Sequence, residues 1–415
     1  MRTRQLLPIA APAVLLLLHA TVAGAGDTSY TQIERGRYLA AAGDCVACHT
    51  AEGGKPFAGG RPVPTPFGKI YAPNITPDKD TGIGNWSEQD FYTAMHEGVD
   101  REGEHLYPAF PYPWFTRMTR DDVSAIKAYL DTLPPVRNET RAPQLPWPMS
   151  WRGSLAVWNR LYFHPGTFQP HPDKSTEWNR GAYLVEGPGH CAACHTPKNM
   201  LGGTKKQLSL SGGDAGEHWY APDLTGDLRE GLGHWSQADI VEYLKTGSNA
   251  KTAATGLMAQ VVEDSTQHLS DSDLRAIAVY LKDMAAREAD DEQTAQPDKQ
   301  AMTEGAGLYL DNCAGCHMSN GAGQQNVFPS LKGSAAVQAK KADTLIHMVL
   351  TGDRMPATSA KPTGLAMPAF DSKLNDREIA ELVTYVRNAW GNRGSAVDAG
   401  TVAQVRKDLQ RASGD

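Results

Sequence analysis

All six cysteines of the chain fall into a recurring pentapeptide whose spacing can attach a metalloporphyrin. The pattern Cys-x-x-Cys-His occurs at residues 45–49, 191–195 and 313–317. Two intervening residues let one helical turn bring both thiols to a porphyrin edge for thioether bonds, and the histidine can then bind the iron. The pattern predicts covalent haem at Cys45, Cys48, Cys191, Cys194, Cys313 and Cys316, with His49, His195 and His317 as axial ligands.

The same pattern also occurs in zinc knuckles, redox dithiols and disulfides. A zinc ribbon pairs its Cys-x-x-Cys units within one small domain, whereas these units lie more than a hundred residues apart. No cysteine is left over outside the three copies. These observations favour three haems over the alternatives.

A haem that only carries electrons needs a sixth ligand, and methionine opposite histidine raises its potential. In the third repeat we expect Met367, which precedes a proline that stiffens the loop, rather than Met355. In the second we expect Met258, because Met200 is too close to Cys194 to reach the opposite haem face.

The first repeat offers more than one sixth ligand. Met118 stands just before an amphipathic helix expected over residues 121–133, and we prefer it to Met95. The alternative for any single methionine is a core residue. His96 and His105 also remain open, and either would lower the potential of that haem.

Short stretches around the first motif recur around the second, which indicates a duplicated domain. Residues 34–39 match 179–184, residues 71–76 match 220–225, and residues 84–88 match 233–237. Ser87 is expected to begin a helix as part of a capping box with Asp90. The expected divisions are a signal peptide (1–25), a first domain (28–137), a Pro/Trp-rich linker (138–178), a second domain (179–284), a charged linker (285–300), a third domain (301–392) and a polar tail (393–415).

The N-terminus has the pattern of a secretory signal. Arg2 and Arg4 precede an apolar run over residues 8–20, and cleavage is expected after Ala25. An uncleaved membrane anchor is the alternative. Export to the periplasm agrees with the haem prediction, because haem c is attached outside the cytoplasm. The formal net charge of −7 and the absence of a basic tract argue against a nucleic-acid partner.

The Pro/Trp-rich linker allows two interpretations. Residues 151–163 are expected to form a helix with an aromatic face. This segment either packs across the first two domains or contacts a partner or membrane surface, where amphipathic aromatics are enriched. The polar tail is expected to form a short surface helix with a weak apolar stripe at Val402, Val405 and Leu409.

With these motifs the chain resembles the triple-haem cytochrome c subunits of bacterial membrane-associated dehydrogenases. The resemblance covers nearly the whole mature chain. Beyond the three haem motifs, it rests on residues 65–68, 74–78, 81–87, 106–112, 189–197 and 367–370. The sequence differs from the family at one position, because members of the alcohol dehydrogenase type carry methionine where this chain has Phe110. This difference argues against membership of the alcohol dehydrogenase branch.

The resemblance implies an all-α fold of three tandem class I-like cytochrome c domains around covalent haem c. It implies an electron-transfer subunit, not itself catalytic on the substrate, beside a catalytic subunit that contains flavin, pyrroloquinoline quinone or molybdenum. The donor would be an alcohol, sugar, sugar acid or aldehyde. Electrons would leave to ubiquinone, a terminal oxidase or a soluble cytochrome, with peripheral association on the outer face of the cytoplasmic membrane. The alternatives are a free-standing multihaem carrier and a haem enzyme such as a peroxidase.

Overall fold

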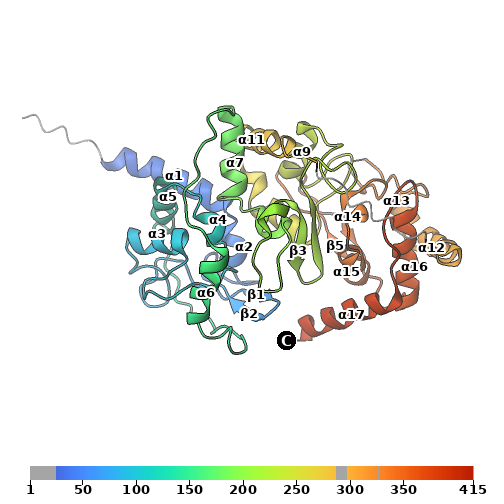
Figure 1. Cartoon of the computed structure of the whole chain (residues 1–415), viewed down its shortest axis with the longest axis horizontal. Coiled ribbons are helices and arrows are strands. Elements are labelled where there is room, and N and C mark those ends of the chain that lie inside the picture. The colour runs from blue at the N-terminus through green and yellow to red at the C-terminus, as the bar shows by residue number, and fades with distance from the viewer. Residues whose placement is uncertain (1–24, 287–296, 326, 415) are drawn as a thin grey trace, which may run out of the picture.

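The computed structural model describes residues 25–286, 297–325 and 327–414, which form three helical domains (Figure 1). Residues 1–24, which carry the expected signal peptide, lie outside the described residues, as do residues 287–296 of the charged linker. Nowhere in the described ranges is a helix both long and apolar enough to cross a membrane.

The first two domains repeat one order of elements, and α6 lies between them. The first domain holds α1 (Ala25–Ala42), α2 (Cys45–His49), β1 (Pro62–Thr65), β2 (Gly68–Tyr71), α3 (Glu88–Glu97), α4 (Tyr112–Phe115) and α5 (Arg120–Leu130), and α6 (Gly153–Tyr162) follows. The second holds α7 (Thr176–Glu186), α8 (Ala192–His195), η1 (Lys206–Leu208), β3 (Ser211–Gly216), β4 (Trp219–Asp223), α9 (Gln237–Thr246), α10 (Gly256–Asp264), η2 (Thr266–His268) and α11 (Asp271–Lys282).

The third domain, orange to red in Figure 1, opens and closes with the same helices but differs between them. Its elements are α12 (Lys299–Asn312), α13 (Ala314–His317), α14 (Ala335–Gln338), α15 (Asp343–Thr351), β5 (Asp353–Arg354), β6 (Ala366–Met367), α16 (Asp376–Asn388) and α17 (Ala399–Gly414). The all-α expectation needs a small addition, because each domain also contains a two-stranded antiparallel hairpin.

In each domain the first helix packs against the closing helix at a glycine. A Cβ added to Gly36 would lie 1.8 Å from the carbonyl oxygen of Ala125 on α5, and one added to Gly181 would lie 1.9 Å from that of Ala276 on α11. In the third domain a Cβ added to Gly305 would lie 2.3 Å from the carbonyl oxygen of Glu381 on α16. The absence of a side chain is what lets the two backbones approach this closely.

The helix start predicted at Ser87 is confirmed. The Ser87 side chain accepts a hydrogen bond from the backbone N–H of Asp90, whose carboxylate accepts from the Ser87 N–H. The second domain repeats this capping box with Ser236 and Asp239. Because the box satisfies two backbone donors that a helix start leaves open, it fixes where α3 and α9 begin.

The C-terminal tail is more deeply packed than its sequence indicates. It forms α17, yet Val402 and Val405 are fully buried in the core of the third domain, among residues of α15 and α16. Leu409 packs against the same core, and Arg406 pairs with Asp376 at 2.7 Å, so polar contacts add to the short apolar stripe in holding the helix.

Candidate haem-binding sites

Each Cys-x-x-Cys-His motif forms a single helical turn directly after the first helix of its domain. In the second motif the backbone N–H of His195 donates to the carbonyl of Cys191 at 3.0 Å, and in the third His317 donates to Cys313 at 2.9 Å. Such a turn brings the two thiols of a motif to one side of the helix. This is the arrangement that attachment to two vinyl groups on one porphyrin edge requires.

All three motif histidines make the same second hydrogen bond. The Nδ1 atom of His49 lies 2.7 Å from the carbonyl oxygen of Pro73, that of His195 lies 2.7 Å from Pro222, and that of His317 lies 3.0 Å from Pro329. A carbonyl can only accept, so Nδ1 carries the proton and Nε2 keeps a free lone pair. Metal-binding histidines are fixed in this way, and the contact orients the ring and raises its basicity.

The same histidines are held neutral. Burial lowers the pKa of His49, His195 and His317, and the bond to the proline carbonyl opposes this shift without overcoming it. A neutral imidazole is the form that binds iron. The residues of the three motifs therefore fit a covalently bound haem with histidine as one axial ligand.

The cysteine thiols are unpaired and protonated. All six cysteines are free of disulfides, and burial raises the pKa of Cys45 to about 12 and that of Cys313 to about 11. A redox dithiol needs a thiolate. In the described ranges, no group of three or more His, Cys, Asp or Glu side chains is placed to hold a metal ion.

The predicted methionine ligands of the second and third domains, Met258 and Met367, are partly buried, and their role as ligands stays a prediction. Met258 lies in the first turn of α10 and packs with Tyr243 around a small apolar cluster. Met367 pairs with Asp353 in the third hairpin and packs against the third core. Its rival Met355 lies in the same loop and lines a cavity of about 150 Å³ beside Pro329.

The first domain still offers several candidates. Met118 and Met95 are both fully buried in the first core, which Cys45 also borders. His105 contacts Asn159 through Nδ1 at 3.2 Å. By contrast, the buried Nδ1 of His96 has no hydrogen-bond partner among the described residues. Met118 therefore stays a prediction, with His96 as the polar alternative.

Phe110, at the position of the departure from the alcohol dehydrogenase type, has an apolar environment. Its ring centroid lies 5.5 Å from that of Phe115 in an edge-on contact, and it packs against the first core.

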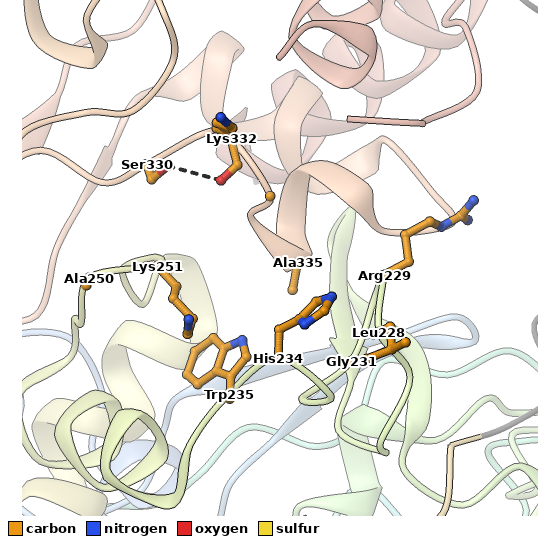
Figure 2. A pocket seen from close by; sticks show the side chains of 11 residues that line it. Leu228, Arg229, Gly231, His234, Trp235, Ala250, Lys251, Ser330, Lys332 and Ala335 are labelled. Atoms are coloured by element: carbon orange, nitrogen blue, oxygen red, sulfur yellow. Dashed lines mark hydrogen bonds between the residues drawn. The ribbon is translucent and has the colours of Figure 1, made fainter. Parts of the chain in front are cut away.

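A cavity of about 270 Å³ between the second and third domains has a basic lining that sequence reasoning missed (Figure 2). Arg229, Lys251 and His234 line it from the second domain, and Lys332 lines it from the third, with no carboxylate in the lining. Trp235, also in the lining, packs against the second core, which Cys191 borders as well. Haem bears two carboxylate groups, and the basic side chains of this lining have the charge to bind a carboxylate.

Comparison with known proteins gives matches along nearly the whole chain. The model of the cytochrome c family matches residues 33–134, 179–285 and 302–390. The gluconate 2-dehydrogenase cytochrome c subunit of Pantoea cypripedii is 43% identical over 91% of this chain and 90% of its own length. The cytochrome c subunit of the quinone-dependent alcohol dehydrogenase of Gluconobacter oxydans is 40% identical over 96% and 87%. The fructose dehydrogenase cytochrome subunit of Gluconobacter japonicus is 37% identical over 96% and 89%.

Proposed function

This chain belongs to the cytochrome c family and to its dehydrogenase cytochrome c subunits, and we propose that it is the triple-haem electron-transfer subunit of a dehydrogenase complex. The observation that carries the proposal is the threefold recurrence of a neutral motif histidine with Nδ1 bound to a proline carbonyl. Relatives of matching length are cytochrome subunits of gluconate, alcohol and fructose dehydrogenases.

The three haem c groups supply one-electron transfer when bound, and the residues of the chain hold and tune them. We assign Cys45, Cys48, Cys191, Cys194, Cys313 and Cys316 to thioether attachment. His49, His195 and His317 are the axial ligands on one face, and Met118, Met258 and Met367 those on the other. A thioether ligand favours the reduced iron, so this set gives higher potentials than two histidines would.

The proposal extends to the setting of the complex. The catalytic partner carries flavin, pyrroloquinoline quinone or molybdenum and oxidises an alcohol, sugar, sugar acid or aldehyde in the periplasm. Electrons leave this chain to ubiquinone, a terminal oxidase or a soluble cytochrome. The chain associates peripherally with the outer face of the cytoplasmic membrane. Its three tandem domains are of the class I-like cytochrome c type.

The test is gentle purification from native membranes, followed by identification of the proteins that accompany the cytochrome. We expect a large dehydrogenase subunit in fixed ratio, and three haems per chain by pyridine haemochrome assay. Replacing Cys191 and Cys194 with Ala should lower the haem content by one third. A cytochrome that always separates alone would instead favour a free-standing multihaem carrier.

A haem enzyme such as a peroxidase is the second alternative, and the unsettled sixth ligand of the first haem motivates it. Such an enzyme requires one open iron. Binding of carbon monoxide to the reduced protein distinguishes an electron-transfer subunit from a haem enzyme. In an electron-transfer subunit, three low-spin haems with both ligands in place should bind little carbon monoxide. A sizeable carbon monoxide-binding fraction would support the enzyme.

A further inference from the structure

Exposed apolar side chains gather around α6 and the loop that follows the second haem motif. The most exposed are Met200, at 95%, and Trp147, at 81%. The group, here named the apolar patch, consists of Trp147, Trp151, Val157, Leu161, Met200 and Leu201. Only four other large hydrophobic side chains are exposed on the described residues: Tyr30, Leu228, Leu310 and Met318.

A hydrogen bond and a ring contact connect the parts of the patch. The indole N–H of Trp158 on α6 donates to the carbonyl of Leu201 at 2.9 Å, which fastens the loop of residues 198–204 to the helix. The ring of Trp151 lies over Gly153 at the start of α6, and Trp147 is in the turn just before. Figure 1 shows α6 at the edge of the molecule, outside the helices of the first domain.

The same segments carry a charge opposite to that of the rest of the chain. Residues 140–172 and 187–213 contain no Asp or Glu, although the whole chain has a net charge of −7. The Nζ of Lys206 lies 3.2 Å from Nδ1 of His164, so the two segments meet just after α6. Arg152 is paired with Asp100 of the first domain. The other basic residues of the segments are Arg141, Arg160, Lys198, Lys205 and Lys206.

We propose that the apolar patch and these basic residues dock the protein on an anionic lipid membrane. Met200 and Trp147 are almost fully exposed within the patch. A bilayer interface accepts such protruding side chains without a matching pocket, whereas protein hot spots are packed into pockets. Tryptophan favours the membrane–water interface. Each basic residue near the surface adds attraction to anionic lipid. The inference rests on the proposed membrane association and names the surface responsible for it.

Vesicle sedimentation of the full-length holoprotein tests the inference. The probes are phosphatidylcholine vesicles with and without phosphatidylglycerol. We expect binding to the anionic vesicles, and at least about tenfold weaker binding when Leu161→Ser and Met200→Ser are combined. Lys205→Gln with Lys206→Gln should remove most of the preference for phosphatidylglycerol, and salt should weaken binding of the unchanged protein.

The matched control is Leu310→Ser combined with Met318→Ser, because Leu310 and Leu161 are both 58% exposed. Equal loss of binding in both double variants, or no binding by the unchanged protein, would overturn the proposal. It would also be overturned if the patch variant bound vesicles normally but no longer purified with a dehydrogenase, since the surface would then belong to a protein partner. Haem content and reduction by the dehydrogenase report separately on the proposed electron-transfer function.

Discussion

The motif histidines owe their chemistry to a contact made on the far side of the ring. Three different proline carbonyls, 12 to 27 residues further along the chain, accept the Nδ1 proton. In each repeat a backbone carbonyl therefore fixes the tautomer of the motif histidine. A substitution at the proline would shift this carbonyl but would not remove it. The opposite axial position has no comparable contact, and its assignment rests on methionines that also serve as core residues.

Substitution of Met118 tests the predicted sixth ligand of the first haem. Met118→Ala should remove the methionine–iron charge-transfer band of one haem, if Met118 is the ligand. The substitution also empties a fully buried position, so it should lower the free energy of unfolding by about 2–5 kcal/mol.

The volume-matched variant Met118→Leu separates the two effects, because it keeps the packing and removes the sulfur. Loss of the band in both variants would establish the ligand. Three intact bands in Met118→Leu would make Met118 a core residue and point to Met95, whereas only two bands in the unchanged protein would point to His96.

At the scale of elements, contact between the first and closing helices defines each domain. A backbone carbonyl of the closing helix occupies the place where a side chain would stand on Gly36, Gly181 or Gly305. The tyrosines Tyr129, Tyr280 and Tyr385 lie beside these glycines in the three domains. The repeat of so specific a contact supports a common ancestor for all three domains, including the divergent third.

Two glycines of α12 provide a matched pair of substitutions. Gly305→Ala should lower the free energy of unfolding of the third domain by about 1–3 kcal/mol, because the new Cβ would clash with the Glu381 carbonyl. Gly307→Ala should raise it by about 0.5–1 kcal/mol, since no atom lies within 4 Å and alanine favours the helix.

Denaturant titration of the holoprotein, followed by the absorbance of its haems, measures both changes. If the two variants were equally destabilised, a general effect on α12 would be responsible, and the close approach at Gly305 would not matter.

At the scale of the whole molecule, the first two domains join through reciprocal contacts. The hydroxyl of Tyr183 in the second domain donates to Asp122 of the first, and that of Tyr38 in the first donates to Asp273 of the second at 2.6 Å. Each carboxylate is also paired with an arginine of its own domain, Arg35 or Arg180. Tyr38 and Tyr183 occupy the same position in their repeats, so each domain donates one tyrosine hydroxyl to a carboxylate of the other.

The third domain joins by other means. Gly307 occupies the repeat position of Tyr38 and Tyr183, two residues after the packing glycine, so the reciprocal contact is lost there. Instead, the β3–β4 hairpin lies against α15. The ring of Trp219 stacks on that of His347 with centroids 4.1 Å apart, and the backbone N–H of Tyr220 donates to the Thr344 hydroxyl.

The interface of the first two domains should make stability depend on acid pH. Burial would raise the pKa of Asp273, but hydrogen bonds from Arg180 and Tyr38 outweigh it and hold the pKa below its usual value. A carboxylate with a depressed pKa adds stability above its unfolded pKa, and this is lost as the pH falls through the folded value. Tyr38→Phe should therefore move the acid-unfolding midpoint to higher pH, as measured by circular dichroism.

Tyr162→Phe is the control for the loss of a hydroxyl, since that ring packs on Trp158 and Gly203. It should leave the midpoint unchanged. An equal shift in the two variants would mean that the Tyr38 hydroxyl has no special role at the interface.

The sequence by itself determined the haem motifs, the duplication of the first two domains and the capping box at Ser87. These features depend on residue types at short spacing, which act within one or two helical turns. The apolar stripe of Val402, Val405 and Leu409 predicts only a surface helix, because a few apolar residues on a polar helix do not reveal the core that covers them.

The tertiary structure alone decided what depends on segments distant in the chain. It identified the proline carbonyls that orient the histidines, the reciprocal pairs of Tyr38 and Tyr183, and the basic cavity that takes Lys332 from another domain. It also showed that α6 and the 198–204 loop form one exposed face. Spacing along a chain specifies local geometry, whereas contacts between domains arise only when separately folded surfaces meet.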